Sequence, residues 1–131
     1  MATSLLKGFS MIPFFENNAL TIYQGNAFTV LSLLPSDSVD AVITDPPYCS
    51  GAATLSGKQA APATKYQQTG TKKTYPPMLG DAKDQRSFTW WMAQWLCECW
   101  RIAIEGAPLL VFSDWRPLPS VTDAVQAAGW T

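Results

Sequence analysis

The run Val39–Thr44 and the tetrapeptide Asp45-Pro46-Pro47-Tyr48 that stops it constrain the fold of this chain more than any other feature. The run is apolar and rich in β-branched residues, which is the pattern of a parallel strand buried on both faces. Proline lacks a backbone donor and has a fixed φ, so the two prolines end the strand abruptly. We therefore expect an α/β fold, with a mostly parallel sheet and flanking helices.

The other segments alternate between strand and helix patterns, which favours parallel strands joined by helices. The expected elements, in chain order, are a strand at Leu20–Tyr23, a helix at Phe28–Leu34, a helix capped by Ser87 and ended by Gly106, a strand at Pro108–Phe112, a helix at Val121–Ala128 stopped by Gly129, and the start of another strand at Trp130-Thr131. Because that last strand is cut short, we expect a fold truncated at its C-terminus.

Apolar residues recur at helical spacing after Ser87 and form one stripe. Its members are Phe88, Trp91, Trp95, Cys99 and Ile102, with Met92 and Leu96 beside them. The stripe could be an aromatic platform for stacking bases. Packing against the sheet is far commoner for such a pattern, and we favour it.

Composition limits the class of protein. The 131 residues are enough for one domain, and the net charge of −1 gives no global sign of a nucleic-acid binder. The chain has no histidine, and its cysteines, Cys49, Cys97 and Cys99, have no metal-ligand spacing. We expect free thiols, no metal site and no membrane span, in a soluble cytoplasmic protein.

Residues 49–84 show no clear period and predict a long, locally basic loop. Four lysines fall within a stretch that contains no acid, and these are Lys58, Lys65, Lys72 and Lys73. Such a loop can contact the phosphates of a nucleic acid. A solvated lysine-rich loop without a partner is an equally good interpretation.

The tetrapeptide also has the chemistry of a binding site for a flat base that bears an amino group. The Asp45 carboxylate and the Pro46 carbonyl can each accept a hydrogen bond from such an amine, and Tyr48 can stack on the ring. The carboxyl end of a parallel strand is also where open α/β sheets bind ligands. The alternative is that the tetrapeptide is only a turn.

Three blocks together resemble the amino-group DNA methyltransferases, which modify adenine N6 or cytosine N4. These blocks are Tyr23–Phe28, Val39–Tyr48 and Gly106–Trp115, and the similarity covers most of Leu20–Trp130. The bacterial and phage group in which the catalytic motif precedes the cofactor-binding motif is the most similar. The resemblance implies a partial Rossmann-like methyltransferase fold, S-adenosylmethionine as methyl donor, double-stranded DNA as partner and a role in restriction-modification or phage DNA modification.

In that family the target base is flipped out of the duplex before methylation. The resemblance implies that Asp45 and the Pro46 carbonyl bind the two amino hydrogens, that Pro47 stiffens the loop and that Tyr48 stacks on the base. Two acceptors off the ring plane favour a pyramidal nitrogen, whose lone pair can attack a methyl group. Asp45 also stabilises the positive charge that develops on nitrogen.

Two departures concern the cofactor. Gly25 and Asn26 occupy a cofactor-binding block, but the family commonly has an acid where Asn26 stands. The glycine-rich cofactor loop is missing, and in this group it lies beyond residue 131. The family also inserts strands from that missing part between Leu20–Tyr23 and Val39–Thr44. We therefore expect an incomplete sheet, an incomplete donor site and doubtful turnover by this chain alone.

The leading hypothesis is a DNA methyltransferase acting on adenine N6, since Asp at the first motif position favours adenine over cytosine in the family. It would form a homodimer at full length. The alternatives are a non-catalytic remnant that binds nucleic acid weakly and an RNA amino-methyltransferase.

Overall fold

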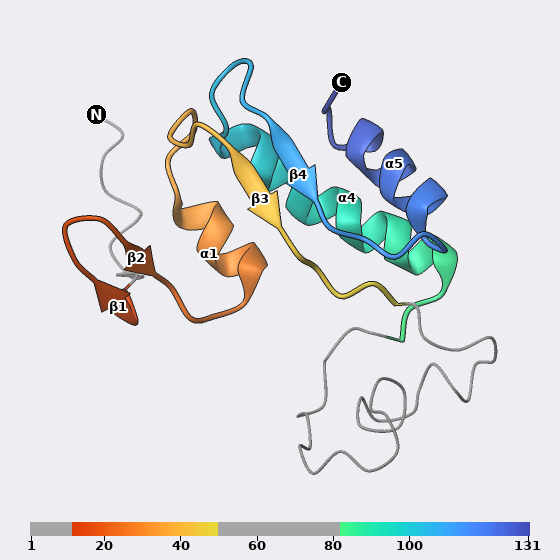
Figure 1. The fold of residues 1–131 in the computed structure, drawn as a ribbon, viewed down its shortest axis with the longest axis horizontal. Helices are drawn as coiled ribbons and strands as arrows, with labels where there is room; N and C mark the ends of the chain where they lie inside the picture. Colours follow the sequence, from red (N-terminus) through yellow and green to blue (C-terminus); the bar gives the residue numbers. More distant parts are fainter. Residues whose placement is uncertain (1–11, 50–81) are drawn as a thin grey trace, which may run out of the picture.

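The computed structural model describes residues 12–49 and 82–131, which form a mixed α/β structure (Figure 1). Its central element is a parallel pair of strands, β3 (Val42–Thr44) and β4 (Leu109–Val111), with Val42 opposite Leu109 and Thr44 opposite Val111. Their connection contains helix α4 (Gln85–Ile102), as a crossover between parallel strands requires. The predicted strands at Val39–Thr44 and Pro108–Phe112 are therefore present but shorter.

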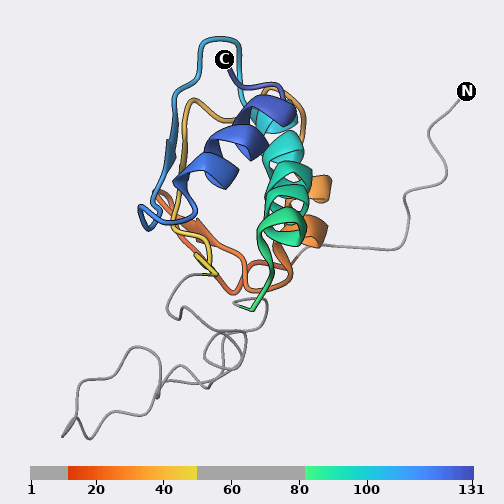
Figure 2. The same cartoon turned by 90° about the vertical axis from the view of Figure 1, so that its right-hand side faces the viewer.

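A single layer of helices covers the parallel pair. Helix α4 lies between α1 (Ala27–Leu33) and α5 (Leu118–Ala127), and all three helices lie on one side of the strands (Figure 2). No element of the described residues covers the other side. The prediction that Val39–Thr44 is buried on both faces is therefore wrong for these residues, because Ile43 is 69% exposed.

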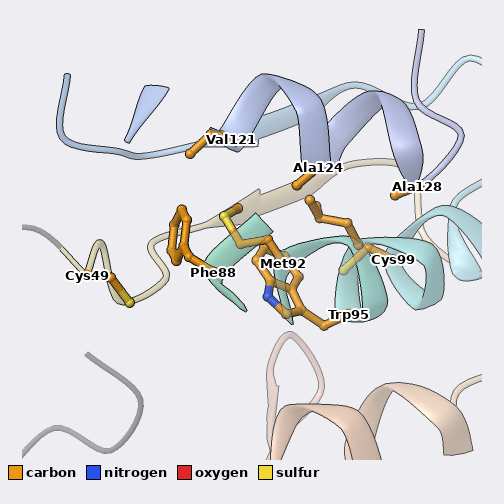
Figure 3. Packing of buried hydrophobic residues seen from close by; sticks show 9 residues of the cluster. Cys49, Phe88, Met92, Trp95, Cys99, Val121, Ala124 and Ala128 are labelled. Atoms are coloured by element: carbon orange, nitrogen blue, oxygen red, sulfur yellow. The ribbon is translucent and has the colours of Figure 1, made fainter. Parts of the chain in front are cut away.

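The core lies between this helix layer and the covered face of the strands. Met92 and Leu96 of α4 are fully buried, and Val121 and Ala124 of α5 pack with them (Figure 3). The predicted stripe of α4 lies in this core, since Phe88, Trp95, Cys99 and Ile102 are buried and Trp91 is half-buried. Core packing, rather than an open stacking platform, is thus confirmed for the stripe.

Helix α1 is held to α4 by a polar contact as well as by apolar packing. Arg101 donates hydrogen bonds to the carbonyl oxygens of Leu31 and Leu34, at 2.9 and 3.0 Å, and to the Ser36 hydroxyl at 3.1 Å. Glu98 accepts from the same guanidinium at 2.9 Å. Arg101 therefore joins the end of α1 to α4, and it adds a side-chain donor for the Leu34 carbonyl and a second donor for the Leu31 carbonyl, which also accepts from the Leu34 N–H.

The N-terminal strands form a separate antiparallel pair. β1 (Phe15–Glu16) pairs with β2 (Thr21–Ile22), with Phe15 opposite Ile22. The strand predicted at Leu20–Tyr23 is therefore real, but β1 was not predicted. β2 has no hydrogen bond to β3, so the described strands form two separate sheets.

Several predicted ends of elements are wrong. Asp84, not Ser87, caps α4, because the Asp84 carboxylate accepts from the Ser87 N–H at 2.8 Å. Helix α4 ends at Ile102, and Gly106, with φ of +79°, lies in the turn before β4. Helix α5 begins three residues earlier than predicted, at Leu118.

Of the two predictions for the C-terminal residues, the stop at Gly129 is confirmed and the strand at Trp130 is wrong. Gly129 follows α5 with φ of +99°, a backbone conformation that favours glycine, as its predicted role as a stop requires. Trp130 does not begin a strand. Its indole N–H donates to the Leu96 carbonyl at 3.2 Å, so the side chain packs back on α4.

Candidate functional site

The tetrapeptide leaves the carboxyl end of β3, as the strand pattern predicted. The Phe112 N–H donates to the Thr44 carbonyl at 2.9 Å, and this is the last bond of the parallel ladder before Asp45. Asp45 is exposed, whereas Pro46, Pro47 and Tyr48 are half-buried. Cys49 follows with φ of +52° and lies in the hydrophobic core (Figure 3). The carboxylate is thus presented to solvent on an anchored loop.

Tyr48 and Asp45 contact each other directly. The Tyr48 hydroxyl donates a hydrogen bond to Oδ1 of Asp45 at 2.5 Å. This hydrogen bond raises the pKa of Tyr48, and the negative charges of Asp45 and Asp114 add to the effect. In this arrangement one carboxylate oxygen is occupied by the tyrosine, and an incoming amine would have to replace that hydroxyl or use Oδ2.

A second carboxylate, Asp114, follows β4 at the same edge of the sheet. Asp114 is held by Arg116, whose backbone N–H and Nη1 donate to its two oxygens at 2.9 and 3.0 Å. Sequence reasoning assigned no role to Asp114. The signal was available, because the carboxyl ends of two parallel strands meet at one edge and Asp114 follows the second strand as Asp45 follows the first.

An apolar cavity of about 420 Å³ adjoins the tetrapeptide. Its lining comes from the end of β2, helix α1, strand β3 and helix α4, and includes Gly25, Phe28, Pro46, Pro47 and Trp95. Val42, Ile43 and Thr44 all line it, although neighbouring strand residues point to opposite faces. The cavity therefore runs along the edge of β3 that has no strand partner among the described residues.

One residue that lines this cavity, Trp95, has a buried polar atom. The indole nitrogen of Trp95 is buried, and no acceptor for it lies among the residues that the structure describes. Buried polar groups are nearly always hydrogen-bonded, so the Trp95 nitrogen is an exception among the described residues. Nothing in the sequence pattern distinguished Trp95 from the other members of its stripe.

The two residues proposed for cofactor binding, Gly25 and Asn26, have different roles in the structure. Gly25 lines the cavity, and a Cβ at this position would come within 3.4 Å of Val30. Asn26 caps α1, since its side-chain oxygen accepts from the Phe28 N–H at 3.0 Å. The side chain of Asn26 thus has a structural role that its place in the block did not reveal.

The remaining predicted site residues cannot be placed. Lys58, Lys65, Lys72 and Lys73 lie outside the described residues, as does most of the predicted loop at 49–84. Cys97 and Cys99 are free thiols in the structure, as predicted for these two residues. In the described part of the chain no group of three His, Cys, Asp or Glu residues could hold a metal ion. No helix there is long and apolar enough to cross a membrane.

Comparison of the chain with protein-family models, with curated proteins and with solved structures found no match.

Proposed function

We propose that this chain carries the base-binding half of a DNA amino-methyltransferase, with adenine N6 as the acceptor. The single observation that supports the proposal most is the direct contact of Asp45 with Tyr48 at the carboxyl end of β3. A carboxylate, a proline carbonyl and a phenol ring in one loop can bind an amino group and stack on the ring that carries it.

Each residue of the loop has a distinct role in this proposal. The Tyr48 hydroxyl leaves Asp45 as the flipped base enters, and the ring then stacks on the base. Asp45 and the Pro46 carbonyl each accept a hydrogen bond from the amino group of the base. These two bonds favour a pyramidal amino nitrogen. As the nitrogen gains a methyl group it becomes positively charged, and the Asp45 carboxylate stabilises that charge and is placed to take the proton.

The cavity beside the tetrapeptide does not suit S-adenosylmethionine. The donor carries an ammonium, a carboxylate and ribose hydroxyls, which need polar partners when they are buried. The cavity beside Pro46 and Pro47 is lined almost entirely by apolar side chains, and Asn26 is engaged as a helix cap. We therefore assign no step of donor binding to these residues, and expect no measurable S-adenosylmethionine binding by this chain in calorimetry.

The test of the proposal is Asp45→Ala in the protein expressed from its complete gene. Transfer of a labelled methyl group to duplex DNA should fall by about 100-fold or more, because a charge-stabilising group of the transition state is removed. Duplex affinity should change little. Asp40→Ala is the matched control, since Asp40 is an exposed carboxylate before β3. Methylation that survives Asp45→Ala would overturn the proposal.

Tyr48 separates stacking from hydrogen bonding. Tyr48→Phe should keep methyl transfer because the ring remains, whereas Tyr48→Ala should lose most of it. An equal loss in both variants would assign the work to the hydroxyl and its bond to Asp45.

The apolar lining of the cavity does not suit the polar groups of a methyl donor, which supports a second candidate, a remnant without turnover that binds nucleic acid at most weakly. Under that function the complete gene product would bind DNA but transfer no methyl group, with or without Asp45.

A further inference from the structure

Trp115 and Arg116 form a fixed aromatic and cationic pair just beyond β4. Trp115 is 76% exposed, and the guanidinium of Arg116 lies over its ring, 5.2 Å from the centroid. Asp114 holds Arg116 by two hydrogen bonds, one to the backbone N–H and one to Nη1. The guanidinium therefore covers one face of the indole ring in a defined position.

The pair still has open binding capacity. One face of the Trp115 ring has no aromatic or cationic neighbour in the described part of the chain, and the Arg116 side chain is 57% exposed. Nε and Nη2 of Arg116 make no hydrogen bond there. An exposed indole face can stack on a base, and free guanidinium donors can bind an anion.

The pair lies at the same sheet edge as the amino-binding loop. Thr44 is opposite Val111 in the parallel ladder, so Asp45 and Asp114 follow neighbouring strands. The charge of Asp114 also acts on the Tyr48 hydroxyl. A polynucleotide that delivered a base to Asp45 would therefore pass close to Trp115.

We infer that Trp115 and Arg116 form a second nucleic-acid contact, in which the indole stacks on a base next to the flipped one and Arg116 binds a phosphate of the same strand. Asp114 is the positioning residue that aims Arg116. A nucleotide supplies both the flat ring and the anion that the pair lacks. A protein partner is disfavoured because a dry interface would have to desolvate the Asp114–Arg116 ion pair. This inference rests on the proposed function for its DNA partner.

The experiment is a duplex-binding titration with a fluorescein-labelled oligonucleotide, followed by anisotropy, on the full chain. Trp115→Ala should weaken binding by about tenfold or more, because stacking of one base is lost, and Trp115→Phe should recover most of the affinity. Arg116→Gln should weaken binding and reduce the slope of log affinity against log salt by about 0.9, the value for one phosphate contact. Asp114→Asn should cause a smaller loss at unchanged salt slope.

Matched controls are Trp90→Ala and Arg86→Gln, which alter an exposed tryptophan and an exposed arginine of α4. If the Trp115 and Arg116 variants bind DNA like these controls, the inference is wrong. It is also wrong if Trp115→Ala changes only self-association in light scattering, which would make the pair a protein-docking surface.

The two proposals fail separately. Loss of binding in Trp115→Ala combined with full methylation in Asp45→Ala would keep the second contact and reject the amino clamp. The reverse result would keep the clamp and reject the contact.

Discussion

The two faces of the β3–β4 pair have similar residues but opposite environments. Val42, Thr44 and Val111 are half-buried beneath the helices, whereas Ile43 and Leu110, which are opposite each other in the ladder, are 69% and 50% exposed. Both faces are apolar, so a single layer of helices leaves one of them in water (Figure 2). The covering layer of helices, and not residue type, therefore decides which apolar residues of these strands stabilise the described structure.

The largest expected loss of stability comes from removing a large buried side chain on the covered side of the strands. Leu96→Ala should lower the free energy of unfolding by about 2–5 kcal/mol, because Leu96 is fully buried and its loss leaves a cavity. Urea unfolding followed by tryptophan fluorescence measures the change. The matched variant Leu110→Ala should cost far less, since half of that side chain is already in water. Equal losses would show that the exposed face is covered in solution.

Removing the polar link within the helix layer should have an intermediate effect. Arg101→Met keeps the aliphatic stem but removes the hydrogen bonds to the Leu31 and Leu34 carbonyls, so it should cost about 2 kcal/mol. Arg86→Met, at an exposed position of α4, is the control and should stay within about 0.5 kcal/mol of wild type. If the free energy of unfolding of Arg101→Met equals that of wild type, apolar packing alone holds α1 against α4.

The smallest effect is a pH dependence on the covered side. Burial raises the pKa of the Cys99 thiol from 9.0 to about 11, and the Glu98 charge adds to this. Because the folded protein holds its proton to higher pH than the unfolded chain, this contribution to stability is present below pH 9 and is lost between about pH 9 and 11. Urea unfolding across that range should show a shallower fall for Cys99→Ala than for wild type. If stability falls equally in Cys99→Ala and in wild type, the Cys99 thiol is not the cause of the pH dependence.

Reactivity gives an independent measure of the same group. Cys97 is exposed, whereas Cys99 is buried. The two cysteines are two positions apart in α4, so their thiols lie on different sides of the helix. Iodoacetamide at pH 8 should modify Cys97 quickly and Cys99 slowly, as peptide mass spectrometry can show. Fast modification of both would contradict the burial of Cys99.

Local patterns predicted most of the elements and part of the site. The helical spacing of Phe88, Trp95 and Cys99 placed α4 and its buried side correctly, because a helix repeats its faces every few residues. Its ends were harder to predict. Ser87 and Asp84 are both good caps, and only the backbone path shows that the Asp84 carboxylate reaches the Ser87 N–H.

The amino-acid sequence is enough to end a strand at the tetrapeptide and to bring Asp45 and Tyr48 together there, because only two residues, both proline, lie between them and proline restricts the backbone. The folded structure was needed to show that the Tyr48 hydroxyl donates to Asp45, that Arg116 lies over the Trp115 ring, and that the Trp95 indole nitrogen is buried without an acceptor among the described residues. The first two contacts join residues close together in the chain, but their geometry, like the burial of Trp95, is set by packing that no local pattern encodes.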